Sequence, residues 1–215
     1  MKCIIFSNGE YGALESYRPL VATAELVLCA DGGANYAYDM QIIPDMIIGD
    51  MDSIRPEVRE YYEQQGVPLQ KFPRRKDFTD TQLVLSIAAS LHASEIVFIG
   101  SLGGRLDHTL SNLFAGLDWA WKGKKISHFH PDYTATLVSN GELEIHGQAG
   151  DLVSVLALSE QARGVSEKGF EYPLDEVLLE SKNPYAVSNV MSEPCSLVSV
   201  REGVLLVIYY RRLPG

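Results

Sequence analysis

The chain has 215 residues, of which 46% are hydrophobic and 21% charged, and its formal net charge at pH 7 is -10. The length fits one large domain or two small ones, and the composition excludes an intrinsically disordered chain and a fibrous protein. The acidic excess argues against nucleic acid or an anionic membrane as partner, because both attract basic surfaces.

The cysteines Cys3, Cys29 and Cys195 are odd in number and widely spaced. We interpret them as buried, reduced thiols rather than as a disulfide or a metal site. The N-terminal apolar run is too short for a signal peptide, and no run approaches the ~18 apolar residues of a membrane helix. We therefore expect a soluble cytoplasmic protein.

Short apolar segments alternate with helical patterns from residue 2 to about residue 130. The predicted strands are Cys3–Phe6, Glu25–Cys29, Met46–Ile48, Pro68–Phe72, Glu95–Ile99 and Ile126–His130. The predicted helices are Pro56–Gln64, with Ser53 as its candidate cap, Asp80–Leu91 and His108–Trp121. Apolar strands alternating with helices predict an open, mostly parallel α/β sheet, covered on both faces.

The helical signal fades after about Pro131. The predicted strands there are Tyr133–Val138, Gly141–Ile145, Leu152–Leu156, Val177–Leu179, Leu197–Val200 and Val204–Tyr210, with turn signals at Asn140-Gly141 and Gly147–Gly150. Regular short strands of this kind are typical of a small antiparallel sandwich or barrel. We therefore expect an α/β domain over residues 1–130 and an all-β domain over residues 131–215.

Six aspartates follow the carboxyl ends of predicted strands in the first domain: Asp31, Asp50, Asp52, Asp77, Asp80 and Asp107. That edge is where open α/β sheets bind ligands. Each aspartate alone is best explained as a helix cap or turn residue, but the shared edge of all six favours a common site. Carboxylates that face one another repel unless a cation lies between them, and Mg²⁺ prefers oxygen ligands and substrate phosphates.

Two glycine-containing segments follow strands, Ala30–Asn35 and Gly100–His108, and the second leads into a predicted helix. Glycines at such a position let backbone N–H groups approach a phosphate. Arg105 and His108 are candidate phosphate contacts. Taken alone, Arg105 is at least as well explained as a solvated surface charge, and His108 as a residue of the first helical turn. The basic run Phe72–Lys76 next to Asp77 is either a nucleotide contact or a solvated loop.

The absence of several well-known motifs argues against some classes of enzyme and of binding protein. The chain has no G-x-x-x-x-G-K-[ST] and no G-x-G-x-x-G after the first strand, which argues against a P-loop enzyme and a dinucleotide-binding protein. It also lacks a G-x-S-x-G elbow and Cys/His spacing typical of a metal site.

Four motifs in order resemble the thiamine pyrophosphokinase family. They are Ala30-Asp31-Gly32-Gly33-Ala34-Asn35; Pro44-Asp45 followed by Ile48-Gly49-Asp50-Met51-Asp52-Ser53; Lys76-Asp77-Phe78-Thr79-Asp80; and Gly103-Gly104-Arg105-Leu106-Asp107-His108 with Asn112. The strand pattern after residue 131 is similar to the family's C-terminal half, with Ser188-Asn189 at its Ser-Asn pair.

The resemblance implies Mg²⁺-dependent transfer of the pyrophosphoryl group from ATP to the thiamine hydroxyl, giving thiamine diphosphate and AMP. It implies a Rossmann-like ATP-binding domain, a thiamine-binding β-sandwich, and a homodimer with active sites between subunits. We expect no nucleic-acid or membrane partner.

The resemblance also implies residue roles. Asp31, Asp50, Asp52, Asp80 and Asp107 are the expected catalytic carboxylates, and Asp50, Asp52 and Asp80 the expected Mg²⁺ ligands. The expected ATP contacts are Gly32, Asn35, Gly103, Gly104, Arg105 and His108, and the expected thiamine contacts are Ser188 and Asn189.

Two other functions stay open at this level. Asp50-Met51-Asp52 also resembles the D-x-D motif of metal-dependent phosphatases, which form an aspartyl-phosphate intermediate. The chain could instead be a non-catalytic sensor of thiamine or a nucleotide. Formation of AMP distinguishes the pyrophosphokinase from both.

Overall fold

The computed structural model describes residues 1–73 and 78–211 and has a mixed α/β fold. It divides into two compact units, Met1–Gly116 with His128–His130, and Leu117–Ser127 with Pro131 onward. A domain boundary at residue 131 stays a prediction, because helix α6 (Leu117–Trp121) precedes that position and groups with the second unit. Asp77 and most of the basic run before it lie outside the described residues.

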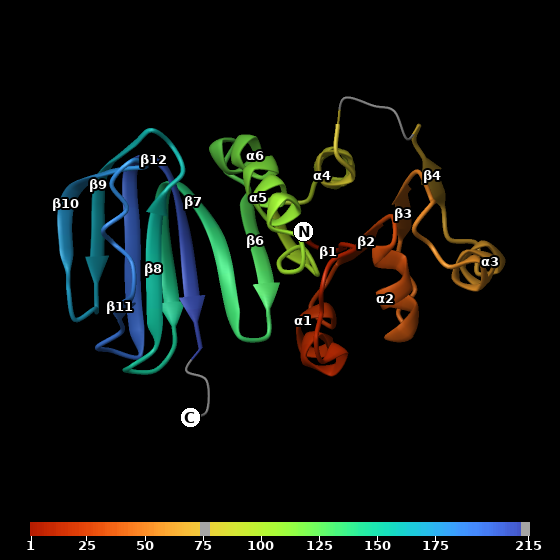
Figure 1. Cartoon of the computed structure of the whole chain (residues 1–215), viewed down its shortest axis with the longest axis horizontal. Coiled ribbons are helices and arrows are strands. Elements are labelled where there is room, and N and C mark those ends of the chain that lie inside the picture. Colours follow the sequence, from red (N-terminus) through yellow and green to blue (C-terminus); the bar gives the residue numbers. More distant parts are fainter. Residues whose placement is uncertain (74–77, 212–215) are drawn as a thin grey trace. The chain divides into compact units, whose positions relative to one another are not determined.

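A parallel sheet forms the centre of the first unit (Figure 1). Its strands are β1 (Lys2–Phe6), β2 (Leu26–Ala30), β3 (Met46–Gly49), β4 (Leu69–Lys71) and β5 (Glu95–Ile99). They lie in the order β5-β1-β2-β3-β4, and every pair is parallel, as expected for the predicted parallel sheet. Strands β2, β3 and β4 are therefore added in sequence on one side of β1, and β5 then pairs with β1 on its other side. The carboxyl ends of all five strands meet at one edge.

Helices cover both faces of this sheet. In Figure 1, α2 (Gly33–Asp39) lies on one side of the sheet and α4 (Asp80–Ser90) on the other. Ile4 and Phe6 of β1 pack in one core cluster with Ala34 of α2, whereas Ile5 between them is buried on the opposite face. Burial of both faces explains why the strands are apolar throughout. The first unit also contains the short helices Leu14–Tyr17 and α1 (Arg18–Val21).

The three predicted helices form, one with the predicted bounds, one a residue shorter (α4), and one divided in two. Helix α3 is Pro56–Gln64, but Arg55 and not Ser53 is its N-cap, and it has no side-chain cap. The predicted helix His108–Trp121 is two helices, α5 (Leu106–Ala115) and α6, because Gly116 ends the first of them. Helix α2 was not predicted: it begins with glycine, a poor helix former, and lacks a side-chain cap.

The second unit is built from antiparallel strands. They are β7 (Tyr133–His146), β8 (Leu152–Ala157), β9 (Gln161–Lys168), β10 (Leu174–Glu180), β11 (Asn189–Val190) and β12 (Cys195–Tyr210). Strand β6 (Lys125–His130) supplies residues to both units.

The long strands β7 and β12 each replace two predicted strands. Asn140-Gly141 is not a turn: Asn140 has a φ of 45° inside β7, and its side chain accepts a hydrogen bond from the Gly203 N–H at 3.0 Å. The pairing register shifts between Val200 and Val204 of the opposite strand. The residues that suggested a turn therefore form an irregularity within the ladder, and β7 continues through them. Strands β9 and β11 were not predicted, because β9 is rich in polar residues and β11 has only two residues.

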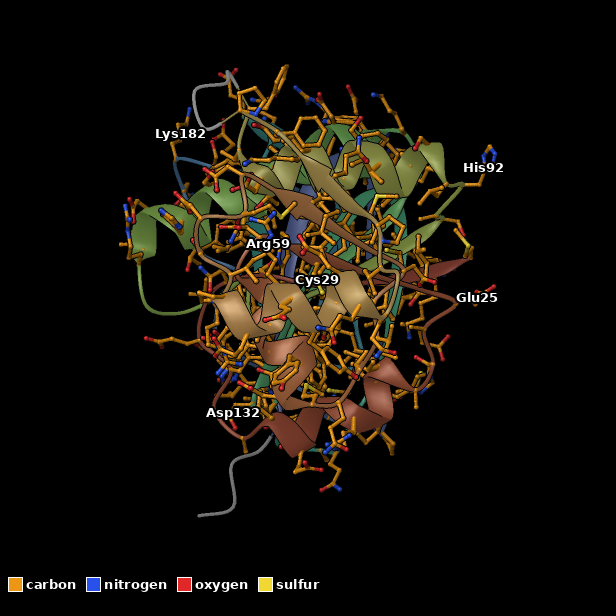
Figure 2. All side chains as sticks on the ribbon, turned by 90° about the vertical axis from the view of Figure 1, so that its right-hand side faces the viewer. Glu25, Cys29, Arg59, His92, Asp132 and Lys182 are labelled. Carbon is orange, nitrogen blue, oxygen red and sulfur yellow. The ribbon has the colours of Figure 1, made fainter. Side chains whose placement is uncertain are left out.

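The cysteines differ in exposure. Cys3 and Cys29 are buried as predicted, but Cys195 is exposed and the prediction of a buried thiol there is wrong. In Figure 2, Cys29 lies within the first unit, whereas His92 projects outward from the turn after α4. Among residues 1–73 and 78–211, no helix combines the length and the apolar character needed to cross a bilayer.

Gly100, directly after β5, is required by the close approach of Tyr11. A Cβ at Gly100 would lie 2.0 Å from the Tyr11 ring, and the φ of Gly100 is +64, in the left-handed region. Gly66 has a similar φ of +75, but a Cβ there meets nothing within 4 Å.

We predict that Gly100→Ala lowers the free energy of unfolding by about 3–5 kcal/mol, because backbone strain and a steric clash add. The control, Gly66→Ala, has the backbone strain alone and should cost about 1–2 kcal/mol. Urea denaturation of both variants measures the difference, and equal costs would contradict a tight contact between Gly100 and Tyr11.

Candidate active site

A cleft of about 610 Å³ opens at the carboxyl edge of the parallel sheet. The predicted site residues in its lining are Asp31, Asp50, Asp52, Asp80, Gly103, Arg105 and His108. Sequence reasoning missed the segment Ser7–Gly9 after β1, which lines the cleft directly beside the loop that begins at Gly100. Strands β1 and β5 are neighbours at the point where the strand order reverses, and such a reversal opens a crevice between the loops that follow the two strands. The sequence signal that could have found Ser7–Gly9 is its position directly after the predicted strand Cys3–Phe6.

Three carboxylates converge in this cleft. Asp31, Asp50 and Asp52 each offer an oxygen, and these oxygens lie within 4.8 Å of one another. The loop after β3 holds two of them in place, because the Asp52 N–H donates to Asp50 Oδ1 at 3.1 Å and the Ser53 hydroxyl donates to Asp52 Oδ1 at 3.1 Å. This arrangement is a cluster of negative charge that a hard divalent cation would stabilise.

Asp31 is the buried member of the cluster, with 7% of its surface exposed. It has a φ of 44°, and its N–H donates to the Ile48 carbonyl at 2.8 Å. A Cβ at Gly49 would lie 2.8 Å from the Asp31 Cβ, so only glycine lets the two loops approach this closely. Asp31 Oδ1 is buried and has no hydrogen-bond partner among the described residues.

The charge of Asp31 is therefore disfavoured. Burial raises the pKa of the Asp31 carboxyl, the Ser53 hydroxyl opposes that shift, and the Asp50, Asp80 and Asp52 carboxylates add to it. A cation bound between these groups would reverse this balance and stabilise the ionised form.

Asp80 is the first residue of α4 and lines the same cleft. Thr79 caps this helix: its hydroxyl accepts from the Gln82 N–H at 3.2 Å, while the Gln82 side chain accepts from the Thr79 N–H at 2.9 Å. The capping box fixes where the helix begins, and a helix N-terminus favours a negative group there.

A chain of hydrogen bonds ties the rear of the cleft together. The Thr81 hydroxyl donates to Asn112 Oδ1 at 2.7 Å, and Asn112 Nδ2 donates to the Ser101 carbonyl at 2.8 Å. The Ser101 hydroxyl lies 2.8 Å from His128 Nδ1. Burial lowers the pKa of His128 to about 3, so this histidine is neutral at pH 7. Of these residues, only Asn112 belongs to the motifs that resemble the family.

Asp107 does not line the cleft. Its carboxylate binds the Arg105 guanidinium through two hydrogen bonds, of 2.6 Å to Nη2 and 3.2 Å to Nε. Hydrogen bonding to Arg105 lowers the pKa of the Asp107 carboxyl. Both side chains are exposed, so the pair orients Arg105 at the mouth of the cleft and contributes little to stability.

Gly32, Asn35 and Gly104 also lie outside the lining. The Asn35 amide is used within the protein: Nδ2 donates to the Ser53 carbonyl at 2.9 Å, and Oδ1 accepts from the Arg55 N–H at 3.0 Å. Asn35 therefore holds the loop that carries Asp50 and Asp52.

Ser188 and Asn189 lie in the second unit. Asn189 is buried, and its Nδ2 donates to Glu167 Oε2 at 2.7 Å and to the Tyr172 carbonyl at 2.8 Å. Its Oδ1 accepts from the Tyr172 N–H at 3.1 Å and the Val190 N–H at 3.0 Å. Ser188 is exposed, with a φ of 58°.

The sequence matches two family models that together span most of the chain. The model of the thiamin pyrophosphokinase catalytic domain matches residues 17–128, and the model of the thiamin pyrophosphokinase vitamin B1 binding domain matches residues 142–205. The chain belongs to the thiamin pyrophosphokinase family. The reaction of this family is the transfer of a pyrophosphoryl group from ATP to thiamine, so the chain is an enzyme of the kinase type.

Individual relatives agree with this family. Thiamine pyrophosphokinase 1 of Oryza sativa subsp. japonica is 29% identical over 206 residues, covering 84% of this chain and 77% of that protein. Thiamine pyrophosphokinase of Bacillus subtilis (strain 168) is 27% identical over 179 residues, covering 83% of this chain and 84% of that protein.

Solved structures have the same fold. The crystal structure of thiamine pyrophosphokinase from Bacillus subtilis superposes with a TM-score of 0.86 at 26% identity, covering 99% of this chain and 100% of that one. The enzyme from Candida albicans superposes with a TM-score of 0.80 at 20% identity, covering 97% of this chain and 88% of that one, which shows likeness of fold alone.

We predict that Asp31→Asn raises the Tm of the metal-free protein at neutral pH, because the amide removes a buried, repelled charge. The pKa of Asp31 is higher in the folded protein than in the unfolded chain, so the ionised carboxylate destabilises the folded state. The destabilisation is complete at pH values above the folded-state pKa. This penalty disappears as the pH falls from the folded to the unfolded pKa. Each kcal/mol corresponds to about 2–4 °C for a chain of this size. Calorimetry in EDTA measures the effect, and a Tm difference independent of pH would contradict it.

Proposed function

We propose that this member of the thiamin pyrophosphokinase family catalyses its reaction in the carboxylate-lined cleft, with Mg²⁺ as the metal. The observation that carries the proposal is the convergence of Asp31, Asp50 and Asp52 oxygens within 4.8 Å, together with a buried Asp31 Oδ1 that has no hydrogen-bond partner among the described residues. We infer that the first unit contains a Rossmann-like ATP-binding domain and that residues 131–215 form a thiamine-binding β-sandwich.

The residues present fit Mg²⁺. Asp50 and Asp52 would hold the metal together with Asp31 or Asp80, since all four line one cleft and offer only oxygen ligands. The metal neutralises negative charge on the phosphates when it is bound. Sulfur and imidazole ligands are absent from the cluster that the described carboxylates form, which favours a hard cation.

The ATP phosphates have candidate contacts on two loops. Arg105 is held by Asp107 in an orientation fixed by two hydrogen bonds, and His108 lies three residues further along in the first turns of α5. A guanidinium matches phosphate oxygens well. Gly103 lines the cleft with a φ of +93, so its backbone is accessible to a phosphate without a side chain in the way. Gly32 and Gly104, the other two expected glycine contacts, lie outside the lining of the cleft.

The two expected thiamine contacts, Ser188 and Asn189, differ in their surroundings: Asn189 is buried and hydrogen-bonded, and Ser188 is exposed. All hydrogen-bonding positions of the Asn189 amide are used by its neighbours in the second unit, so we propose that Asn189 shapes the segment around Ser188. The exposed Ser188 is then the candidate contact to thiamine. Both residues lie within the match to the vitamin B1 binding domain.

A homodimer is supported by the apolar face of α5. Leu106, Leu110 and Phe114 are spaced by four residues, so they share one face of the helix. They are 73%, 46% and 51% exposed, which is unusual for three large apolar side chains in a row. We propose that a second copy of the chain covers this face.

The function is tested by incubating the protein with ATP, Mg²⁺ and thiamine and resolving the products. We expect AMP and thiamine diphosphate in equal amounts, and neither in EDTA. ADP with thiamine monophosphate would indicate transfer of a single phosphoryl group. Release of inorganic phosphate independent of thiamine would favour the phosphatase, and binding without turnover would favour the sensor.

We predict that Asp52→Asn lowers kcat by about 10²–10³ with the fold intact, because it removes charge where the phosphates react. The matched control is Asp118→Asn, which changes an exposed aspartate of α6 outside the cleft and should leave kcat unchanged. Near-normal turnover in a folded Asp52→Asn protein would remove Asp52 from the metal site.

We predict that Phe114→Glu converts the dimer to a monomer, since a charge on the α5 face opposes its burial against a second copy. The control is Ile43→Glu, at another exposed apolar residue that is not on α5. Light scattering after size exclusion measures the mass. A dimer mass for the Phe114→Glu variant as well as for the Ile43→Glu variant would place the interface elsewhere.

A further inference from the structure

Three metal-ligating side chains of different chemistry meet on paired strands of the second unit. They are Glu144 and His146 of β7 and Cys195 of β12. Cys195 stands directly opposite His146 in the antiparallel ladder (strands in Figure 1), and Glu144 lies two residues before His146 on the same face of the strand. No role proposed above for ATP, thiamine or the dimer involves them.

Their ligand atoms are already close together. Glu144 Oε1 lies 2.9 Å from His146 Nε2 and 3.3 Å from Cys195 Sγ. All three ligand atoms lie within 4.8 Å of one another. In a tetrahedral zinc site with bonds of about 2.0–2.3 Å, neighbouring ligand atoms are about 3.3–3.7 Å apart. Small side-chain movements would therefore bring all three atoms to zinc-binding positions.

The donor set selects the class of cation. A thiolate, an imidazole and one carboxylate suit Zn²⁺, whereas Mg²⁺ prefers oxygen ligands alone. The three side chains are exposed, so a cation can reach them from solvent and water can take the fourth position. The ladder between β7 and β12 fixes the spacing of their Cα atoms.

We propose that Glu144, His146 and Cys195 form a binding site for Zn²⁺, separate from the aspartate cluster of the catalytic cleft. On binding, the Cys195 thiol loses its proton to solvent and its sulfur bonds to the metal. Without metal, the same three groups are held together by the hydrogen bond from Cys195 to Glu144 and by the contact between His146 and Glu144.

The test uses Co²⁺ as a spectroscopic substitute for Zn²⁺, added to the full chain in saturating Mg²⁺ so that oxygen-only sites are occupied. We expect a thiolate-to-cobalt charge-transfer band in the near ultraviolet, which added Zn²⁺ removes. Cys195 is the exposed cysteine, while Cys3 and Cys29 are buried in the first unit, so the band reports on Cys195. Absence of the band at saturating Co²⁺ would overturn the proposal.

Variants distinguish ligation from general attraction of a cation. We expect Cys195→Ser to abolish the band, and Glu144→Gln to weaken Zn²⁺ binding by about tenfold or more. The matched control is Glu142→Gln, which removes the same charge two residues away on the same face of β7. A band that persists in Cys195→Ser, or equal loss of affinity in Glu142→Gln and Glu144→Gln, would contradict the site.

A second control compares His146→Gln with His92→Gln, since His92 is an exposed histidine of the first unit. Only the His146 variant should bind Zn²⁺ more weakly. Circular dichroism checks that each variant is folded, and because all the substituted side chains are exposed we expect native spectra.

Discussion

Repulsion among carboxylates at the carboxyl edge of the parallel sheet is the interaction on which the catalytic unit depends. Asp31, Asp50 and Asp52 follow two neighbouring strands, and oxygens of all three lie within 4.8 Å of one another. Loops that carry like charges would separate if they were free to move. They are held by short-range contacts instead: the close approach at Gly49, and the two hydrogen bonds by which Asn35 binds the loop after β3. The protein is thus preorganised for a cation and phosphates, at the cost of a strained, charged cleft.

The opposite wall of the cleft depends on apolar packing. The Tyr11 ring stacks on Tyr36 with centroids 4.1 Å apart, and its hydroxyl donates to the carbonyls of Ser7 and Ile99 at 2.9 and 3.1 Å. Tyr11 therefore joins the ends of β1 and β5, the two strands between which the strand order reverses. Gly100 is the residue that leaves room for the Tyr11 ring. A buried aromatic residue thereby sets the separation of two loops that line the cleft.

The second unit uses a buried polar network for a similar purpose. Glu167 is fully buried on β9, and burial raises the pKa of its carboxyl while the hydrogen bond from Asn189 opposes that shift. Asn189 connects this strand to the segment around Tyr172. Networks of this kind stabilise one conformation when their members are satisfied. We infer that the position of Ser188 depends on this network, although Ser188 itself is exposed.

Local sequence was sufficient to predict the parallel strands, the helix Pro56–Gln64 and the aspartates of the cleft, because strand periodicity, helix signals and motif spacing are properties of neighbouring residues. Four motifs in order were also sufficient to identify the family. The sequence did not reveal that Asn140-Gly141 continues a strand, that Gly116 divides a helix, or that Asn35 and Asp107 bind neighbouring residues without lining the cleft. Those outcomes depend on partners distant along the chain, such as the strand opposite Asn140. The meeting of Cys195 with Glu144 and His146 is of the same kind: about fifty residues separate them, and only the register of β12 against β7 brings the three side chains together.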